Sequence, residues 1–336
     1  MGYRLSLLEK SPVDGQEGAA AALQRTLTLA QSAERWGFHR FWLSEHHNNP
    51  QLAISSPEIA IAWILAQTSR IRVGSGGVML QHYSPFKVAE NFNQLASLAP
   101  GRVDLGVGKA PGGLPLSTRA LQQGTAALRK PDFPLQLQQL TDWLLSPAAV
   151  SEPDSLIATP APPEPAGRFL LGASVATARL AAESGWHFVF AAQLNGSEEE
   201  ISSALGTYHR LSHGRKALLA VPVVVADSKE QAEELLGPRQ QFRITDAEGH
   251  HVSVGSLEQA EAWIRQAGGG SHDIEERPSL VLTGTASQVH RQLATLQARY
   301  GIEEFVIDTP ISDATARLAS LAALASGYEL LSGAAQ

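Results

Sequence analysis

The residues best suited to chemistry in this sequence follow short apolar runs. His46 comes directly after the run 40–45, and an imidazole can act near neutral pH as an acid, a base or a hydrogen-bond donor. Lys109 follows Gly106 and Gly108, whose small size leaves room for a flat ligand, and a lysine can bind a phosphate as a point charge. Ser174 begins a helical stretch, and the first N–H groups of a helix attract anions. These residue types indicate an acid–base histidine and an anion site.

The histidine pair His46–His47 has two further explanations. Both could be ordinary loop histidines, or they could bind a metal ion together with Glu45. Adjacent strand residues point to opposite faces, so these three side chains would converge only if the strand had already ended. No third ligand of obvious spacing follows, which makes a metal site the weaker hypothesis.

The anion site also has alternatives. Lys109 could be an ordinary solvated lysine, and Ser174 could be a plain helix N-cap. A capping serine can still contact a phosphate, so the two roles of Ser174 are compatible. Residues 283–285 (Thr-Gly-Thr) begin another helix and offer a second possible anion site. Spacing alone does not decide between the two helix starts.

Eight β-rich runs alternate with stretches of helical periodicity along the chain. The runs span residues 3–8, 40–45, 71–76, 103–108, 168–172, 186–191, 217–226 and 304–308. This alternation predicts a parallel sheet, and eight units predict an α/β fold that closes into a (β/α)8 TIM-like barrel. A doubly wound sheet would need a glycine fingerprint in its first turn to bind a dinucleotide, and residues 9–15 lack one. In a barrel the active site lies at the carboxyl ends of the strands, where His46, Lys109 and Ser174 fall.

Two irregular regions interrupt the alternation after the fourth and the seventh strand. The first, at about 110–165, ends in a proline-rich run that we interpret as a linker into the next strand. The second, at about 240–278, contains three consecutive glycines, 268–270, and polar loops. Because the alternation resumes after each region, we expect both to be insertions into a single domain that spans residues 1–336.

Composition excludes several classes of protein. The 336 residues include 26 Lys and Arg against 33 Asp and Glu, a net charge of −7, which argues against a general nucleic-acid binder. The chain has no cysteine, so disulfide scaffolds, zinc–thiolate sites, iron–sulfur clusters and thiol nucleophiles are excluded. The longest apolar run, 217–226, is about half the length of a membrane helix, and the N-terminus does not resemble a signal peptide. We therefore expect a soluble cytoplasmic protein that binds neither nucleic acid nor membrane.

Four segments in the first 110 residues, in the same order, resemble the bacterial luciferase-like flavin monooxygenase family. These segments are 40–48, 68–80, 84–90 and 100–109. The second half matches more loosely, through 172–185 and 283–293, and the overall similarity is to the small single-chain members. The resemblance implies a TIM-like barrel that uses reduced FMN and O2 on a small organic substrate.

The resemblance also implies roles for single residues. His46 matches the active-site histidine, and the Gly76–Gly77 bond matches a non-proline cis peptide beside the flavin ring. Lys109 stands where many relatives carry an arginine that binds the phosphate, so the charge is kept but the bidentate fork is lost. Ser174 matches the start of the phosphate-binding helix, which favours that helix over 283–285. We thus expect His46 to be catalytic, no metal ligand, and six flavin-binding residues, which are Gly76, Gly77, Gly108, Lys109, Ser174 and Thr177.

The leading functional hypothesis is an FMN-dependent monooxygenase supplied with reduced flavin by a separate reductase, because no dinucleotide fingerprint is present to bind NAD(P)H. The alternatives are a flavin oxidoreductase that uses NAD(P)H or a deazaflavin without oxygen insertion, a non-catalytic flavin-binding protein, and a metal-dependent barrel hydrolase or isomerase. The resemblance further implies a homodimer packed through the second and third helices. Apolar candidates for that interface are Ile59, Trp63, Phe92 and Ala96.

Overall fold

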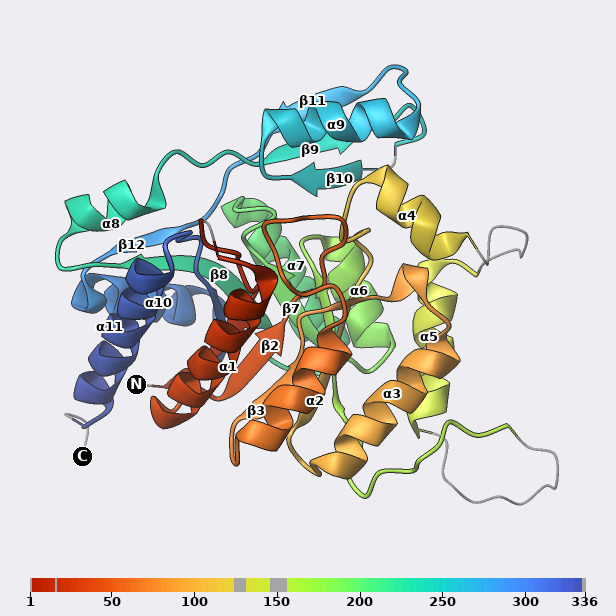
Figure 1. Cartoon of the computed structure of the whole chain (residues 1–336), viewed down its shortest axis with the longest axis horizontal. Coiled ribbons are helices and arrows are strands. Elements are labelled where there is room, and N and C mark those ends of the chain that lie inside the picture. Colours follow the sequence, from red (N-terminus) through yellow and green to blue (C-terminus); the bar gives the residue numbers. More distant parts are fainter. Residues whose placement is uncertain (1, 16, 124–130, 146–155, 250, 334–336) are drawn as a thin grey trace.

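Eight parallel strands close into a barrel in the computed structural model, which describes residues 2–15, 17–123, 131–145, 156–249 and 251–333. In barrel order the strands are β1 (Arg4–Glu9), β2 (Arg40–Leu43), β3 (Arg72–Ser75), β5 (Val103–Gly108), β6 (Gly167–Gly172), β7 (His187–Ala191), β8 (Leu218–Val225) and β13 (Glu304–Asp308). Each pairs with the next, and β13 pairs back with β1. The predicted TIM barrel is confirmed (Figure 1).

Helices cover the outside of the barrel because each has one apolar stripe to bury. They are α1 (Ala19–Arg35), α2 (Pro57–Gln67), α3 (Pro85–Leu98), α6 (Val175–Glu183), α7 (Glu198–Leu211), α8 (Lys229–Leu236), α10 (Ala286–Tyr300) and α11 (Ala314–Gly333). Proline opens α2 and α3, a position where its missing N–H costs nothing. Thr285 and Gln288 form a capping box at the start of α10, in which each side chain accepts a hydrogen bond from the backbone N–H of the other residue.

The interior of the barrel is filled by a small apolar cluster that includes Leu8, Trp42, Phe169 and Val306. Beneath this cluster, at the amino ends of the strands, lies a buried charge network. Asp104 is fully buried and accepts hydrogen bonds from Arg40 at 2.7 Å and from Trp42 Nε1 at 3.1 Å. A second arginine from the start of β3 reaches the same carboxylate at 2.6 Å. The network closes the amino-terminal end of the barrel and leaves the carboxyl ends as the open face.

The first irregular region lies between β5 and β6 and contains α4 (Pro115–Gln122) and α5 (Phe133–Leu145). Shorter elements complete the barrel, namely β4 (Val78–Met79), a 3-10 helix (Leu80–His82) and β12 (Leu282–Gly284), which pairs with the end of β8.

The expectation of polar loops for 240–278 is wrong. This region forms a three-stranded antiparallel sheet of β9 (Phe242–Thr245), β10 (His251–Val254) and β11 (Asp273–Glu276), with α9 (Leu257–Ala267) packed on one face. We call this unit the insertion sheet. Its strands are only four residues long, so their alternating pattern is visible only once they pair, and the apolar residues then meet those of α9.

The candidate interface residues on α2 and α3 divide into two pairs. Phe92 and Ala96 are buried in the core, so neither can contribute to an interface. Ile59 and Trp63 are 71% and 37% exposed, and they leave an apolar surface on α2. Within the described ranges, no helix combines the length and the apolar character that crossing a membrane requires.

Candidate active site at the carboxyl ends of the strands

Four adjacent strands carry the residues singled out in the sequence. β2, β3, β5 and β6 are neighbours in this order, and parallel strands present their carboxyl ends on the same side. His46 follows β2, Gly76 follows β3, Lys109 follows β5 and Ser174 follows β6. We call this side of the barrel the rim. The fold therefore places all the candidate residues along one arc of the rim.

His46 is half-buried and hydrogen-bonds through Nδ1 to Ser44 Oγ at 3.1 Å. Burial lowers the pKa of His46 from 6.5 to about 4, and the positive charge of Lys10 adds to this shift, while Asp308 opposes it. The imidazole is thus neutral at pH 7, which revises the expectation of an acid–base group that titrates there. A neutral ring offers one donor and one acceptor nitrogen.

The sequence did not predict the ion pair that lies beside His46. Lys10 follows β1, and its Nζ donates a hydrogen bond of 2.6 Å to Oδ2 of Asp308, at the end of β13. Asp308 is fully buried, and its second oxygen Oδ1 has no hydrogen-bond partner among the described residues. The only sequence signal was position, because both residues lie at carboxyl ends of predicted strands.

His47 points into a separate hydrogen-bond network. Its Nε2 lies 2.7 Å from Glu45 Oε1, and Tyr83 donates to the same oxygen at 2.8 Å. The backbone N–H of Met79 donates to Glu45 Oε2 at 3.1 Å. The network ties the loop after β2 to the segment after β3. Among the described residues, no three His, Cys, Asp or Glu side chains are grouped so as to hold a metal ion.

The peptide bond between Gly76 and Gly77 is cis, as the resemblance implies. Atoms of the barrel pack closely against both glycines. A Cβ on Gly76 would lie 2.7 Å from Leu8 Cδ1, and one on Gly77 would lie 2.8 Å from the backbone oxygen of Gly106. Glycine is therefore required where this segment packs against β5 and the barrel interior.

The expected phosphate site lies where β5 and β6 end. Val107 is opposite Leu170 in the β5–β6 register, so Lys109 lies level with Gly172, two residues before Ser174. Ser174 caps α6 by accepting from Thr177 N at 3.2 Å, and their side-chain oxygens are 3.0 Å apart. Lys109 is exposed.

Two observations test whether these residues fit a flavin phosphate. An added Cβ on Gly108 would make only ordinary van der Waals contact, with the flexible side chain of Met79 at 3.7 Å, so packing does not force a glycine there. The alternative helix start, at α10, is capped more completely, because Gln288 Oε1 accepts from Thr285 N at 2.8 Å while Thr285 caps the helix. The start of α6 is the better match for a phosphate.

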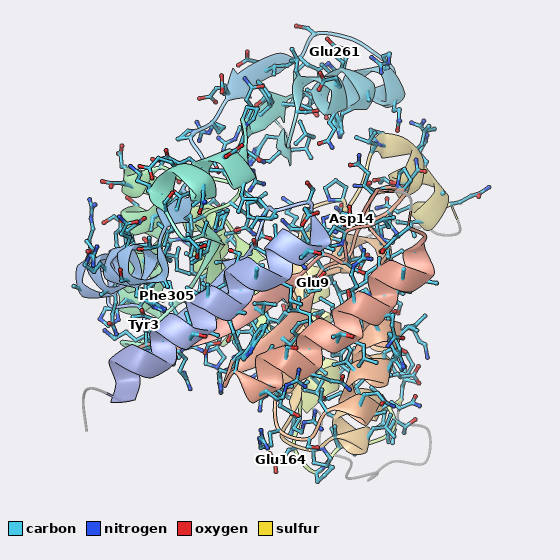
Figure 2. All side chains as sticks on the ribbon, turned by 60° about the vertical axis from the view of Figure 1, so that its left-hand side comes forward. Tyr3, Glu9, Asp14, Glu164, Glu261 and Phe305 are labelled. Carbon is cyan, nitrogen blue, oxygen red and sulfur yellow. The ribbon has the colours of Figure 1, made fainter. Side chains whose placement is uncertain are left out.

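The two insertions meet above the rim. Leu116 N and Arg119 Nη1 of α4 donate to Gln266 of α9, at 3.1 and 2.8 Å. Figure 1 shows the insertion sheet at the same end of the barrel as α4, with β10 on the barrel side. In Figure 2, Glu261 marks the outer surface of this region, and Glu9 and Asp14 lie on the side of the barrel that faces it. The rim is therefore covered by elements from two different parts of the chain.

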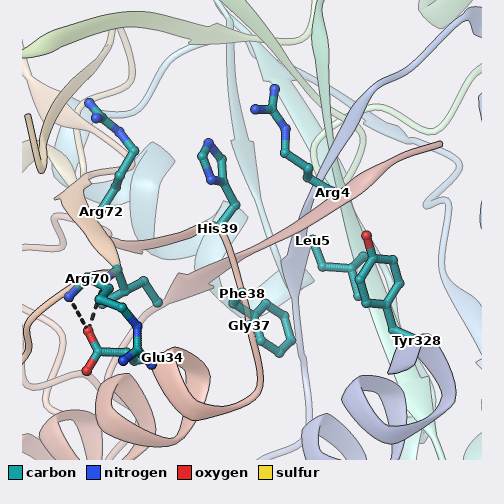
Figure 3. A pocket seen from close by; sticks show the side chains of 10 residues that line it. Arg4, Leu5, Glu34, Gly37, Phe38, His39, Arg70, Arg72 and Tyr328 are labelled. Carbon is teal, nitrogen blue, oxygen red and sulfur yellow. Dashed lines mark hydrogen bonds between the residues drawn. The ribbon is translucent and has the colours of Figure 1, made fainter. Parts of the chain in front are cut away.

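A cavity of about 320 Å³ lies at the opposite end of the barrel, among Arg4, His39 and Arg70 (Figure 3). These residues stand at the amino ends of strands, next to the buried charge network. Glu34 accepts three backbone N–H bonds there, from residues 69–71, at 2.6–3.0 Å. This face of a TIM barrel serves stability rather than catalysis, so the cavity is not the candidate site.

Comparison with known proteins identifies relatives of the whole chain. A family model described as luciferase-like monooxygenase matches residues 3–304. The N-acetyl-S-alkylcysteine monooxygenase of Bacillus subtilis (strain 168) is 42% identical over 341 residues, which cover 98% of each chain.

Two solved structures are similar over nearly their whole length. The crystal structure of apo-MsnO8 has 29% identity and a TM-score of 0.76, covering 98% of each chain. The oxygenating constituent of 3,6-diketocamphane monooxygenase from Pseudomonas putida, in complex with FMN, has 16% identity and a TM-score of 0.68, covering 97% of this chain and 98% of that one. The latter likeness shows the fold alone. From the family match and the 42% identical relative, the chain belongs to the luciferase-like monooxygenase family.

Proposed function

We propose that this protein is an FMN-dependent monooxygenase that takes reduced flavin from a separate reductase and oxidises a small organic thioether with O2. The observation that carries the proposal is the arc of candidate residues along four adjacent strand ends, in a chain of this family. The separate reductase, the homodimer and the cytoplasmic location remain predictions from the sequence.

In this proposal Lys109, Ser174 and Thr177 would hold the FMN phosphate, and Gly108 and the Gly76–Gly77 peptide would border the flavin ring. Bound there, reduced FMN would supply the two electrons that O2 needs to deliver one oxygen atom to the substrate and the other to water. A lysine ammonium, a serine hydroxyl and a helix N-terminus together provide charge and directed donors for a phosphate. The absence of a side chain at Gly108, where only the flexible side chain of Met79 comes within 4 Å of an added Cβ, supports the placement of the ring.

His46 is the residue that we propose acts on the reacting oxygen and substrate. Its pKa of about 4 keeps it neutral at pH 7, so it donates or accepts a hydrogen bond rather than delivering a proton as imidazolium. The Ser44 hydroxyl holds Nδ1, which leaves Nε2 for the ligand. The Lys10–Asp308 pair places an ammonium and a carboxylate group near the ring.

The first candidate substrate follows from the 42% identical relative, which is named for N-acetyl-S-alkylcysteine. Such a molecule combines a thioether with a carboxylate and is small enough for a barrel mouth. We therefore choose N-acetyl-S-ethylcysteine as the test substrate.

The experiment supplies reduced FMN from a purified flavin reductase and NADH under ¹⁸O2. We expect oxygen uptake that depends on the thioether, and one ¹⁸O atom in an organic product by mass spectrometry. General acid–base or hydrogen-bond assistance is typically worth about 10²–10⁴-fold in rate. His46→Ala should lose product formation by that factor and release hydrogen peroxide instead, while its FMN affinity stays near that of the wild type.

His47→Ala is the matched control, and it should retain most of the activity. Turnover with a reduced deazaflavin but not with FMN would favour the oxidoreductase alternative. FMN binding without any effect on oxygen uptake would favour the non-catalytic alternative. Equal activity of His46→Ala and wild type would remove His46 from the mechanism.

A further inference from the structure

The insertion sheet has one face against α9 and one polar face. Phe242 and Ile244 of β9 are buried against α9. Side chains alternate along a strand, so Arg243 and Thr245 lie on the other face. His251 is paired with Thr245 in the β9–β10 register and joins that polar face.

Arg243 is a cation on this face that forms no ion pair with any of the residues that the structure describes. Glu275 is its partner in the β9–β11 register, but Glu275 Oε1 accepts from Arg277 Nη1 at 2.8 Å instead. Arg277 continues the β11 ladder and lies on the same face as Glu275. Asp273, the other acid of the face, is exposed at its far end, opposite Thr245.

The Nε atoms of Arg243 and Arg277 are both buried without a hydrogen-bond partner among the described residues. No hydrogen bond or ion pair of the Arg243 guanidinium is found in that part of the chain. A buried charged group is costly unless it is paired. The two arginines therefore present unused donors in a partly enclosed place.

The edge of this polar face that carries His251 lies toward the rim. Burial lowers the pKa of His251, and the positive charges of Arg243, Lys109 and Arg277 lower it further. Lys109 belongs to the end of β5, so the polar face of the insertion sheet lies near this part of the rim. Figure 1 shows β10, which carries His251, on the barrel side of the insertion sheet.

We propose that Arg243 and Arg277 bind an oxyanion of the ligand over the barrel mouth, and that this oxyanion is the carboxylate of an acidic substrate. The inference rests on the proposed function and extends it to the class of substrate. A guanidinium fork matches a carboxylate in a bidentate manner, which a lysine cannot do. The FMN phosphate is the other possible source of an oxyanion, but Lys109, Ser174 and the start of α6 already suit it.

The test compares N-acetyl-S-ethylcysteine with its neutral carboxamide, which has the same size but no charge. We would measure kcat/KM with reduced FMN and, by calorimetry on the FMN-loaded full-length protein, the binding of each compound. Arg243→Met and Arg277→Met keep most of the side-chain volume. A hydrogen bond to a charged group accounts for about 10- to 100-fold in affinity, so each variant should lose that factor for the acid and less than about threefold for the carboxamide.

Arg265→Met is the matched control, because Arg265 lies on α9 in the same insertion with its side chain 69% exposed. It should change neither compound. The affinities for FMN and riboflavin are measured for all variants, and we expect them to be unchanged.

Three outcomes would overturn the inference. Equal losses for acid and carboxamide would show that charge is not recognised. A loss of FMN affinity without a loss of riboflavin affinity would assign the arginines to the phosphate. A wild-type protein that binds both compounds equally would remove the carboxylate site and leave the flavin chemistry standing. Conversely, Arg243-dependent binding of the acid without any oxidation would refute the proposed function and support this inference.

Discussion

His46 should make the stability of this protein depend on pH. Its pKa is lowered from 6.5 to about 4 in the folded state. At about 1.4 kcal/mol per pKa unit, this corresponds to about 3 kcal/mol in favour of the neutral ring. The unfolded chain binds a proton at His46 below pH 6.5, whereas the folded chain does so only near pH 4. The stabilisation is therefore complete above pH 6.5 and is lost as the pH falls toward 4.

The change is His46→Gln, which keeps hydrogen-bonding capacity and removes the titration. The free energy of unfolding is measured in urea at pH 7.5 and at pH 5. Linkage assigns to His46 a loss of roughly 2 kcal/mol between these two pH values, and about 1 kcal/mol more by pH 4. The loss on going to pH 5 should be smaller in His46→Gln than in wild type by this 2 kcal/mol.

Other buried histidines, such as His290, also have lowered pKa values and contribute in the same direction. The comparison with wild type removes their contribution. His209→Gln, a change of an exposed histidine, is the control and should lose the same stability as wild type. If His46→Gln loses as much stability at pH 5 as wild type does, the ring is not held neutral, and the mechanistic role assigned to its neutral form is wrong.

Three further predictions test other parts of the structure. Lys109→Ala should weaken FMN binding by about tenfold and leave riboflavin binding unchanged. This factor is the lower end for a charge-assisted hydrogen bond, because Lys109 is exposed. Lys87→Ala is the control, and equal losses for FMN and riboflavin would contradict a phosphate role. Light scattering at micromolar concentration should give the mass of a dimer, and Ile59→Glu or Trp63→Glu should give a monomer; a monomeric wild type would refute the interface on α2. Asp104→Asn should destabilise the protein by about 3–5 kcal/mol in denaturant, because Arg72 loses its carboxylate partner and Arg40 keeps only Glu304; a loss below about 1 kcal/mol would show that the network is not essential.

The barrel was predictable because its strands are short, apolar and regularly separated by helices. The boundaries of β5 and β13 match the prediction, and the other barrel strands differ by one or two residues at one or both ends. The insertion sheet was missed because four-residue strands such as β9 carry too little pattern, and their apolar residues form a core only together with α9. Local pattern therefore suffices for the barrel and fails where structure arises from pairing alone.

The candidate site was predictable only in part, for a related reason. His46 and the glycines after β3 belong to contiguous segments, so a resemblance could identify them. Lys10 and Asp308 are separated by 298 positions and meet only because β1 and β13 close the barrel. The low pKa of His46 depends on burial and on that ion pair, which no local pattern encodes.

The way in which the insertion sheet is attached has a consequence for the divergence of such enzymes. β8 ends at Val225, and β12 returns beside it with Gly284 opposite Val225, so the excursion leaves and rejoins the barrel at neighbouring backbone positions. Its two ends are held by barrel strands whatever lies between them, and a long connection costs little extra loop-closure entropy. The excursion can therefore be lengthened, shortened or exchanged between homologues without repacking the barrel. Substrate selectivity can therefore change through substitutions in the insertion sheet, while the candidate residues at the strand ends are selected separately.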